Sequence, residues 1–265
     1  MGKISVAIPV FNSSKYLDSL IKRLVRYESV GEIIIFDDCS DNQDFKNTKK
    51  IAEKYSKSKK PIHLYRNNEN LGAFKTKYNS IEKCSFDIVY QIDSDNLPMF
   101  KFDKFVKENI LTNFNNENIY YPAKIYQFYQ FPYLSLIRSR INKKFRVYIQ
   151  KVDFKTDKEV LKDALINNKS ITYEKNLRWL TNIGNFFVNK NNFLNATKEG
   201  LSLEKNDLAV DAVAITYYWI KNYRYIVQKK NHYHFHRKRE DSISVVTKNI
   251  TDKNFEQFET KIKLL

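Results

Sequence analysis

Strand-like segments that alternate with helix-like segments are the feature that most constrains the fold of this chain. Residues 3–11, 32–38, 61–67 and 86–93 read as short strands, and most of them are apolar and rich in β-branched residues. The segments between them, 13–27, 44–57 and 71–83, have the spacing of helices. A helix near 101–112 and a strand at 118–123 continue the pattern. Apolar strands separated by helices indicate a mostly parallel sheet that is covered by helices on both faces. The sequence therefore predicts an α/β fold.

The second half of the chain is less regular. Residues 125–178 are aromatic and basic without a clear period, and an extended hairpin, an amphipathic surface segment and a partner-binding flap all stay open. A strand that turns into a helix (182–194), a helix (204–222), a strand (223–230) and a final charged helix are expected after it. Because no repeat, low-complexity linker or clear break interrupts the chain, we predict a single domain over residues 1–265.

The charge balance narrows the class of partner only slightly. The chain has 46 Lys and Arg against 30 Asp and Glu, a net charge of +16. Such a charge attracts nucleic acid, phosphorylated small molecules or an anionic membrane surface, but it also accompanies a composition that is rich in lysine and asparagine. The sequence has no signal peptide and no apolar run of about 18 residues, so a soluble intracellular protein is expected. Cys39 and Cys84 are too few for a disulfide framework or a zinc cluster.

Two of the predicted strands end in acidic residues. Asp37 and Asp38 follow one strand, and Asp93-Ser94-Asp95 follows another. In an open α/β sheet, ligands bind at the carboxyl ends of the strands, so these carboxylates are expected to meet at one edge. A Mg²⁺ or Mn²⁺ ion bound with a phosphorylated ligand would relieve their repulsion. Asp38 suits the acceptance of hydrogen bonds from a nucleotide base or ribose better than it suits metal binding.

Four motifs in this half, taken together, resemble a known family. The segments "ISVAIPVFNSSKYLDSLIKRL", "EIIIFDDCSD", "NNENLGAFKTKYNSI" and "FDIVYQIDSDN" are similar in order and spacing to the N-terminal half of a family 2 glycosyltransferase of the GT-A fold. The resemblance covers residues 3 to about 100. It implies a Rossmann-like, mostly parallel sheet flanked by helices, with a C-terminal acceptor-side segment. It also implies a nucleotide-sugar-binding half (1–124) and an acceptor-binding half with a C-terminal tail (125–265).

The resemblance implies a set of donor-binding residues: Pro9, Val10, Phe11, Asp38, Gly72, Lys77, Asp93, Ser94 and Asp95. In this set Phe11 lies against the base, Asp38 binds the base, and Lys77 reaches the diphosphate or the base. The implied metal, Mn²⁺ or Mg²⁺, is held by Asp93, Asp95 and His236, with Asp95 as the direct ligand of first choice. Cys39 stands where the family usually has glycine, so the turn after Asp38 is expected to differ. Each residue also has a structural interpretation: Pro9 ends a strand, Phe11 belongs to the core, Lys77 lies on a solvated helix face, and Gly72 starts a helix.

The second half is expected to supply a general base, because a transfer that inverts the anomeric centre must deprotonate the acceptor hydroxyl. The resemblance places this base near the start of a helix, and we choose Asp211, which lies among apolar residues. Asp207 lies one turn earlier, where it alternatively serves the helix dipole. Trp179, Gly184, Asn185 and Asp207 are assigned to the acceptor pocket.

Three of the four histidines lie close together near the C-terminus. Strand alternation would point His232, His234 and His236 to one face, as in a metal cluster, but no other Cys or His is near in sequence, and zinc is not expected. The resemblance assigns His236 and Arg237 to a segment that folds over the donor phosphates. A basic surface strand is the alternative.

These observations predict a metal-dependent glycosyltransferase of cell-surface polysaccharide or glycolipid synthesis, and the family resemblance implies that it inverts the anomeric centre. Its expected partners are a nucleotide-diphosphate sugar, first of all a UDP-sugar, and a saccharide or lipid-linked saccharide acceptor. A cytoplasmic location is expected, with peripheral contact to the anionic inner face of the membrane through residues 125–150. One alternative is an inactive sugar- or nucleotide-binding GT-A-like domain. The other is a nucleotidyltransferase, which would be expected to have a phosphate-binding loop rich in glycine and basic residues after the first strand, and this chain lacks such a loop. An RNA-binding protein would leave the acidic strand ends unexplained, so no nucleic-acid partner is expected.

Overall fold

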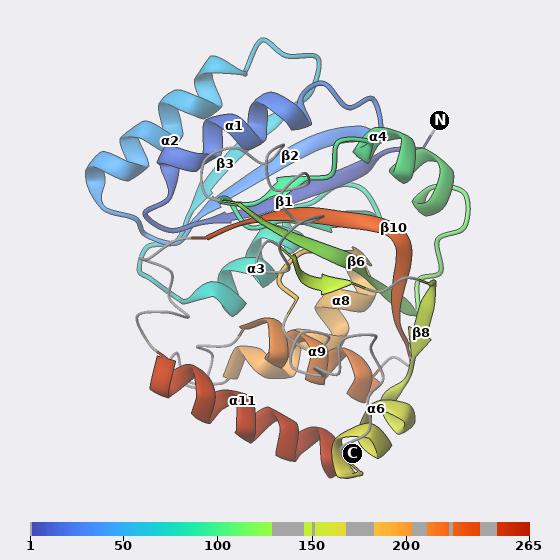
Figure 1. Cartoon of the computed structure of the whole chain (residues 1–265). Helices are drawn as coiled ribbons and strands as arrows, with labels where there is room; N and C mark the ends of the chain where they lie inside the picture. Colours follow the sequence, from blue (N-terminus) through green and yellow to red (C-terminus); the bar gives the residue numbers. More distant parts are fainter. Residues whose placement is uncertain are drawn as a thin grey trace.

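The computed structural model describes residues 2–128, 146–149, 152–167, 183–202, 211–222, 225–238 and 248–265. Its centre is a mixed sheet that has ten strands in the described residues, in the order β3-β2-β1-β4-β9-β6-β10-β5, with β7 beside β6 and β8 beside β10 (Figure 1). The strands are β1 (Ile4–Val10), β2 (Val30–Asp37), β3 (Ile62–Arg66), β4 (Ile88–Gln91), β5 (Leu97–Pro98), β6 (Asn118–Phe128), β7 (Arg146–Ile149), β8 (Phe154–Thr156), β9 (Phe186–Asn189) and β10 (Tyr225–Arg237).

The first four strands are parallel, as the apolar runs predict. β2 pairs with β1 and β3, and β1 pairs with β4, all in parallel. β9 is antiparallel to β4 and β6, whereas β6 and β10 are parallel to each other. The predicted α/β class, a mostly parallel sheet flanked by helices, is therefore confirmed, and the sheet contains strands from both halves of the chain.

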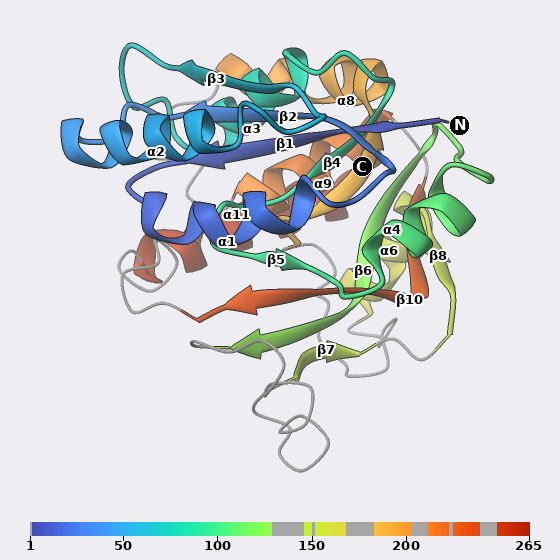
Figure 2. The ribbon, with the colours of Figure 1, turned by 90° about the horizontal axis from the view of Figure 1, so that it is seen from above.

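Helices cover both faces of the sheet. They are α1 (Ser14–Leu24), α2 (Asn42–Lys54), α3 (Ala73–Glu82), α4 (Phe102–Phe105), the π-helix η1 (Val106–Ile110), α6 (Lys158–Ile166), α8 (Lys190–Thr197), the 3₁₀-helix η3 (Lys198–Ser202), α9 (Asp211–Asn222) and α11 (Lys248–Lys263). In Figures 1 and 2, α1, α2 and α4 lie on one face, and α3, α8, α9 and α11 lie on the other. Two apolar cores follow from this arrangement: one contains Leu17 and Leu20 of α1, and the other contains Phe74 of α3 and Trp219 of α9.

Several predicted boundaries differ from the structure. The helix expected at 101–112 is a short α4 followed by the π-helix η1. β6 runs on to Phe128, into the segment that has no clear sequence period, because its outer half pairs with both β7 and β10. β10 is longer than the predicted strand 223–230, and the register shifts between Lys229 and Tyr233. Pairing with distant segments, which local periodicity does not record, extends both strands.

Among the described residues, no helix is long and apolar enough to cross a bilayer.

Candidate active site

The acidic strand ends meet at one edge of the sheet, as predicted. The parallel registers pair Val10 of β1 with Asp37 of β2, and Asp37 with Arg66 of β3. On the other side of β1, Ala7 pairs with Gln91 of β4, and the amide of Ile92 donates to the carbonyl of Ala7 (3.0 Å). Asp93 therefore follows β4 beside the end of β1, on the same edge as Asp37 and Asp38.

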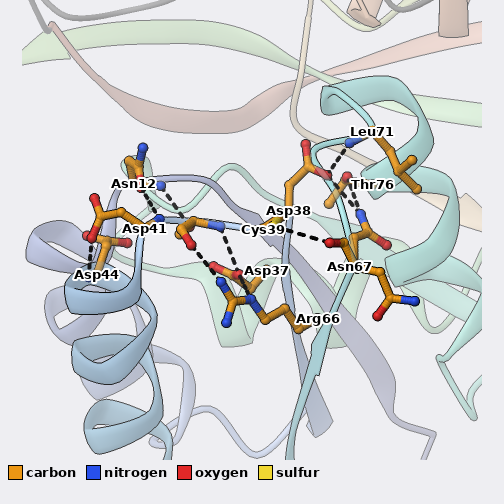
Figure 3. Close-up of polar contacts among 12 residues, drawn as sticks. Asn12, Asp37, Asp38, Cys39, Asp41, Asp44, Arg66, Asn67, Leu71 and Thr76 are labelled. Carbon is orange, nitrogen blue, oxygen red and sulfur yellow. Dashed lines mark hydrogen bonds and ion pairs between the residues drawn. The ribbon is translucent and has the colours of Figure 1, made fainter.

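Asp38 is buried and is largely occupied by the protein's own donors. Its Oδ1 accepts hydrogen bonds from the backbone amide of Leu71 (2.8 Å) and from Nδ2 of Asn67 (2.8 Å), and its Oδ2 accepts one from the amide of Gly72 (2.9 Å) (Figure 3). Gly72 has φ 87° and precedes α3, a backbone conformation that favours glycine. A carboxylate has about four acceptor positions, so these three bonds leave one on Oδ2 for a ligand N–H or O–H.

Asp37 points to the opposite side of β2 and forms a structural ion pair. Its Oδ1 accepts from the amide of Ser40 (3.0 Å) and lies 3.2 Å from Nε of Arg66, whose Nη2 donates to the carbonyl of Ser40 (Figure 3). Burial raises the pKa of Asp37 despite the hydrogen bonds from Ser40 and the charge of Arg66. Arg66 was not predicted as part of this edge, although it follows the third apolar run as the aspartates follow the second.

The turn after Asp38 has, at Cys39, a backbone conformation that favours glycine. Cys39 has φ 59°, and the neighbouring Asn12 has φ 46°. The two turns are joined: the amide of Asn12 donates to Oγ of Ser40 (2.9 Å), and the amide of Asp41 donates to Oδ1 of Asn12 (2.9 Å). A cysteine thus adopts the left-handed conformation for which the family uses glycine.

The residues predicted to line the base pocket take different positions. Val10 is buried in the apolar core and Pro9 is half-buried on β1, whereas Phe11 is 40% exposed just beyond the strand end. Ser94 is buried, and its hydroxyl lies 2.6 Å from that of Ser13 at the start of α1. Of these four side chains, Phe11 is the one that is open to a ligand, whereas the hydroxyl of Ser94 holds α1 to the loop after β4.

Lys77, Asp93 and Asp211 form a buried charge cluster that joins the two halves of the chain. Nζ of Lys77 lies 2.9 Å from Oδ1 of Asp93 and 2.5 Å from Oδ2 of Asp211, and it donates to the carbonyl of Gly184 (3.4 Å). Lys77 is 3% exposed, so it is not on a solvated helix face. Burial alone would lower its pKa, but the charges of Asp211 and Asp93 outweigh this effect and raise the pKa above the usual lysine value.

The segment before β9 packs closely against this cluster. A Cβ on Gly184 would lie 2.7 Å from Oδ2 of Asp93 and 3.2 Å from Nζ of Lys77, so a larger residue does not fit without a shift. Oδ1 of Asn185 accepts from the amide of Asp93 (2.9 Å). Both residues were predicted for the acceptor pocket, and both touch the acidic turn after β4. Asp207 and Trp179, which were predicted with them, lie outside the described residues.

The histidine-containing strand reaches the same turn, and its three histidines differ in burial. The amide of Arg237 donates to Oδ1 of Asn96 (3.2 Å), and its Nε donates to the carbonyl of Asp95 (3.2 Å). His236, the residue before Arg237, is exposed, but His232 and His234 are buried, and His232 stacks on Phe105 at a centroid distance of 4.9 Å. His234 and His236 lie side by side, with ring centroids 6.3 Å apart, while His232 packs against the apolar core.

The chemistry of the ligands at the acidic turn fits a divalent cation. The two oxygens of Asp93 already contact Lys77, Gln91 and, at 3.5 Å, Asn96. Carboxylate and imidazole groups suit Mn²⁺ or Mg²⁺, and Asp95 and His236 offer one of each. Within the described ranges no three His, Cys, Asp or Glu side chains stand together as a complete metal site, so a cation here would take further ligands from the donor diphosphate.

Comparison with known proteins matches the first part of the chain to a family. Residues 5–108 match the model of Glycosyl transferase family 2. The chain carries a family 2 glycosyltransferase domain. This family 2 domain contains Asp38, Lys77, Asp93 and Asp95, whereas Gly184, Asp211 and His236 lie beyond it. The resemblance noted from the four motifs is thereby confirmed.

Two proteins, TuaG and TarS, are similar to this chain in sequence or in fold. The chain is 29% identical over 106 residues to "Putative teichuronic acid biosynthesis glycosyltransferase TuaG" of Bacillus subtilis (strain 168), which is 40% of this chain and 40% of that protein. The fold is similar to the crystal structure of S. aureus TarS 1–349 in complex with UDP-GlcNAc, with a TM-score of 0.62 and 20% identity over 91% of this chain and 60% of TarS 1–349. The complex of the same protein with UDP gives a TM-score of 0.60 at 16% identity over 98% of this chain and 70% of TarS 1–349. The GT-A-like fold beyond the family 2 domain is therefore shared with TarS, while the chain spans less than two thirds of TuaG.

Proposed function

We propose that this protein is a metal-dependent glycosyltransferase that moves a sugar from a nucleotide-diphosphate donor to an acceptor hydroxyl. The observation that carries the proposal is the meeting of Asp38, Asp93 and Asp211 at one sheet edge, where Lys77 joins Asp93 to Asp211. These carboxylates come from a strand end, a turn and a helix start that are far apart in sequence. A sheet edge built in this way would present Asp38 to a nucleotide and Asp211 to an acceptor.

Asp38 is the proposed contact for the base or ribose, because Oδ2 keeps an acceptor position beside the start of α3. Phe11, which is 40% exposed at the end of β1, offers its ring to the base. Arg237 lies beside the acidic turn, with its guanidinium 4.6 Å from the ring of Tyr16 and 4.5 Å from that of Phe128. Its positive charge at the turn suits the diphosphate.

Asp95, with His236 and the donor phosphates, would hold Mn²⁺ or Mg²⁺, and this cation would neutralise the charge that develops on the diphosphate. Asp211 is the proposed general base. It begins α9, and its side chain is 20% exposed while Oδ2 is buried against Lys77. It would take the proton from the acceptor hydroxyl as the hydroxyl oxygen bonds to the anomeric carbon and the bond to the diphosphate breaks.

The relatives support a substrate class. TarS has been crystallised with UDP-GlcNAc and with UDP, and TuaG is named for teichuronic acid biosynthesis. We therefore propose a UDP-sugar donor and a saccharide or lipid-linked saccharide acceptor of cell-surface polymer synthesis. The net charge of +16 suits acceptors held at an anionic membrane, and co-sedimentation that does not depend on anionic lipid would remove the membrane part of the proposal.

A thermal-shift panel tests the donor class. UDP-, GDP-, CDP- and dTDP-sugars are compared with and without Mn²⁺. We expect stabilisation by one nucleotide, UDP first, and a larger shift with Mn²⁺, because a ligand that binds only the folded state stabilises it. No shift with any nucleotide sugar would contradict the proposal.

A further inference from the structure

The ammonium group of Lys77 is the only buried lysine charge among the residues that the structure describes. It lies between Asp93 of the proposed donor site and Asp211, the proposed general base. Lys77 is on α3, and its side chain is 3% exposed. Three oxygens surround Nζ: Oδ1 of Asp93 at 2.9 Å, Oδ2 of Asp211 at 2.5 Å and the carbonyl of Gly184 at 3.4 Å. An ammonium group has three N–H donors, and the three oxygens match them in number.

This geometry argues against direct binding of the donor diphosphate by Lys77. A phosphate could reach Nζ only by displacing one of the three oxygens, and two of these belong to charged carboxylates. Either displacement of a carboxylate would break the ion pair of Lys77 with Asp93 or with Asp211 and leave that carboxylate without the lysine. Arg237 lies at the same acidic turn and is the better-placed cation for the diphosphate.

The contacts of Asp211 indicate what the lysine does. Oδ2 of Asp211 is buried and receives no well-directed hydrogen bond within the described residues, so the charge of Lys77 is its principal partner. The same ammonium contacts Asp93, whose backbone amide donates to Oδ1 of Asn185 (2.9 Å). Gly184 lies against both Asp93 and Lys77, where a Cβ would be 2.7 Å from Oδ2 of Asp93. The cluster thus ties the start of α9 to the turn after β4.

We propose that Lys77 is a positioning residue that fixes Asp211 relative to the acidic turn of the donor site, and that it does not itself bind the donor. This inference rests on the proposed function. The family 2 domain ends before Asp211, so Lys77 is the link through which the donor-binding domain holds a base from the second half of the chain. A misplacement of about 1 Å at a reacting group is enough to reduce a rate by about 100-fold.

The test separates binding from turnover in the full chain. The variants are Lys77→Met, Lys77→Arg and, as a matched control on the same helix, Lys75→Met. Affinity for UDP with Mn²⁺ is measured by calorimetry, and turnover is measured as UDP release from UDP-GlcNAc. We expect Lys77→Met to keep the affinity for UDP within about 2-fold while kcat falls by about 100-fold. Lys77→Arg is expected to recover part of kcat, and Lys75→Met to change neither. A loss of UDP affinity that matches the loss of kcat, or an unchanged kcat, would overturn the inference.

A second measurement does not depend on catalysis. The urea midpoints of Lys77→Met, Asp211→Asn and the double variant form a double-mutant cycle. We expect the double variant to be less destabilised than the two single changes together predict, because Asp211→Asn removes the charge that Lys77→Met leaves unpaired. Additive midpoints would overturn the inference, whatever the substrate is. If the wild type binds no UDP while the cycle shows coupling, the positioning contact stands and the donor class is wrong. If Lys77→Met does not fold, Lys77→Arg carries the comparison of affinity with turnover, and Lys77→Arg with Asp211→Asn forms the cycle.

Discussion

Asp38 is held by the protein on three of its acceptor positions, so it has a structural role beside its proposed binding role. Leu71 and Gly72 donate their backbone amides to it, and Asn67 donates its side-chain amide. Asp38 therefore anchors the entry into α3, the helix that carries Lys77. The sequence predicted the contact with a base but not this anchoring, because the partners lie about 30 residues away and have no charge pattern of their own.

The substitution Asp38→Asn tests this double role. The side-chain amide that it introduces would turn N–H groups toward backbone N–H donors, so we expect a loss of about 1–3 kcal/mol in the free energy of unfolding together with weaker binding of UDP. Urea unfolding and calorimetry measure the two effects. Asp41→Asn is the matched control, because Asp41 caps α2 by accepting from the amide of Asp44, and asparagine caps a helix about as well as aspartate. Equal stability of Asp38→Asn and the wild type would contradict this view of Asp38.

Cys39 has an unfavourable backbone conformation that glycine would relieve. With φ 59°, the left-handed region costs a residue that has a Cβ about 1 kcal/mol. We expect Cys39→Gly to keep or raise the stability, by up to about 1 kcal/mol, while Cys39→Ala, which keeps the Cβ, does not gain. The urea midpoints of both variants measure this. A clear destabilisation by both variants would show that the thiol, which lies 3.5 Å from the carbonyl of Asn68, matters more than the backbone.

At the scale of elements, the first half of the fold could be predicted well and the second half only in outline. β1 to β4 and α1 to α3 follow local apolar patterns, so the predicted segments agree with the structure within a few residues. The extension of β6 to Phe128 and of β10 to Arg237 depends on their pairing with each other, which no local pattern contains. The proximity of Arg237 to Asp95 follows from that pairing, and only the family resemblance had pointed to Arg237.

The candidate site could likewise be predicted only in part from the sequence. Asp93 and Asp38 were recognisable because they interrupt or end apolar strands. Lys77 and Asp211 were recognised singly, but their shared contact was not, because a lysine among many lysines gives no sign of burial. Asn67 and Arg66 were missed, although Arg66 could be found by aligning the predicted strand ends in parallel register.

The close approach of the segment before β9 to the turn after β4 can be tested at Gly184. We expect Gly184→Ala to move the carboxylate of Asp93 or the ammonium of Lys77, because the added Cβ would lie 2.7 Å from the former. Overpacking of this kind costs about 1–3 kcal/mol, and we expect UDP release from UDP-GlcNAc to fall by at least about 10-fold. Stability and turnover that both equal the wild type would show that the segment adapts and that the packing is not needed. A suitable control is Gly2→Ala, where the nearest atom to an added Cβ is a flexible leucine side chain at 3.3 Å.

At the scale of the whole molecule, two buried histidines make the stability sensitive to acid. Burial lowers the pKa of His232 to about 3 and lowers the pKa of His234 well below its usual value. In the unfolded chain both titrate near 6.5, so below that pH the unfolded state binds more protons than the folded state. The free energy of unfolding therefore falls as the pH decreases from about 6.5, by up to about 1.4 kcal/mol per pH unit for each histidine.

His232→Phe tests this origin of the acid sensitivity. The ring of His232 stacks on Phe105, so phenylalanine keeps the aromatic contact and removes the proton site. We expect a flatter dependence of the urea midpoint on pH between about 6.5 and 4. His63→Phe, on the exposed side of β3, is the control and keeps the wild-type slope. An unchanged slope in His232→Phe would assign the acid sensitivity to other groups.

The central claim is that the acidic edge of the sheet binds a nucleotide diphosphate together with a divalent cation. Calorimetric titration of UDP, with and without Mn²⁺, into the wild type and into Asp95→Ala tests it most directly. The wild type is predicted to bind UDP more tightly when Mn²⁺ is present, and Asp95→Ala is predicted to lose this dependence on Mn²⁺ while it stays folded. Wild-type protein that binds no UDP under either condition, or an Asp95→Ala variant that keeps the full effect of Mn²⁺, would contradict the claim.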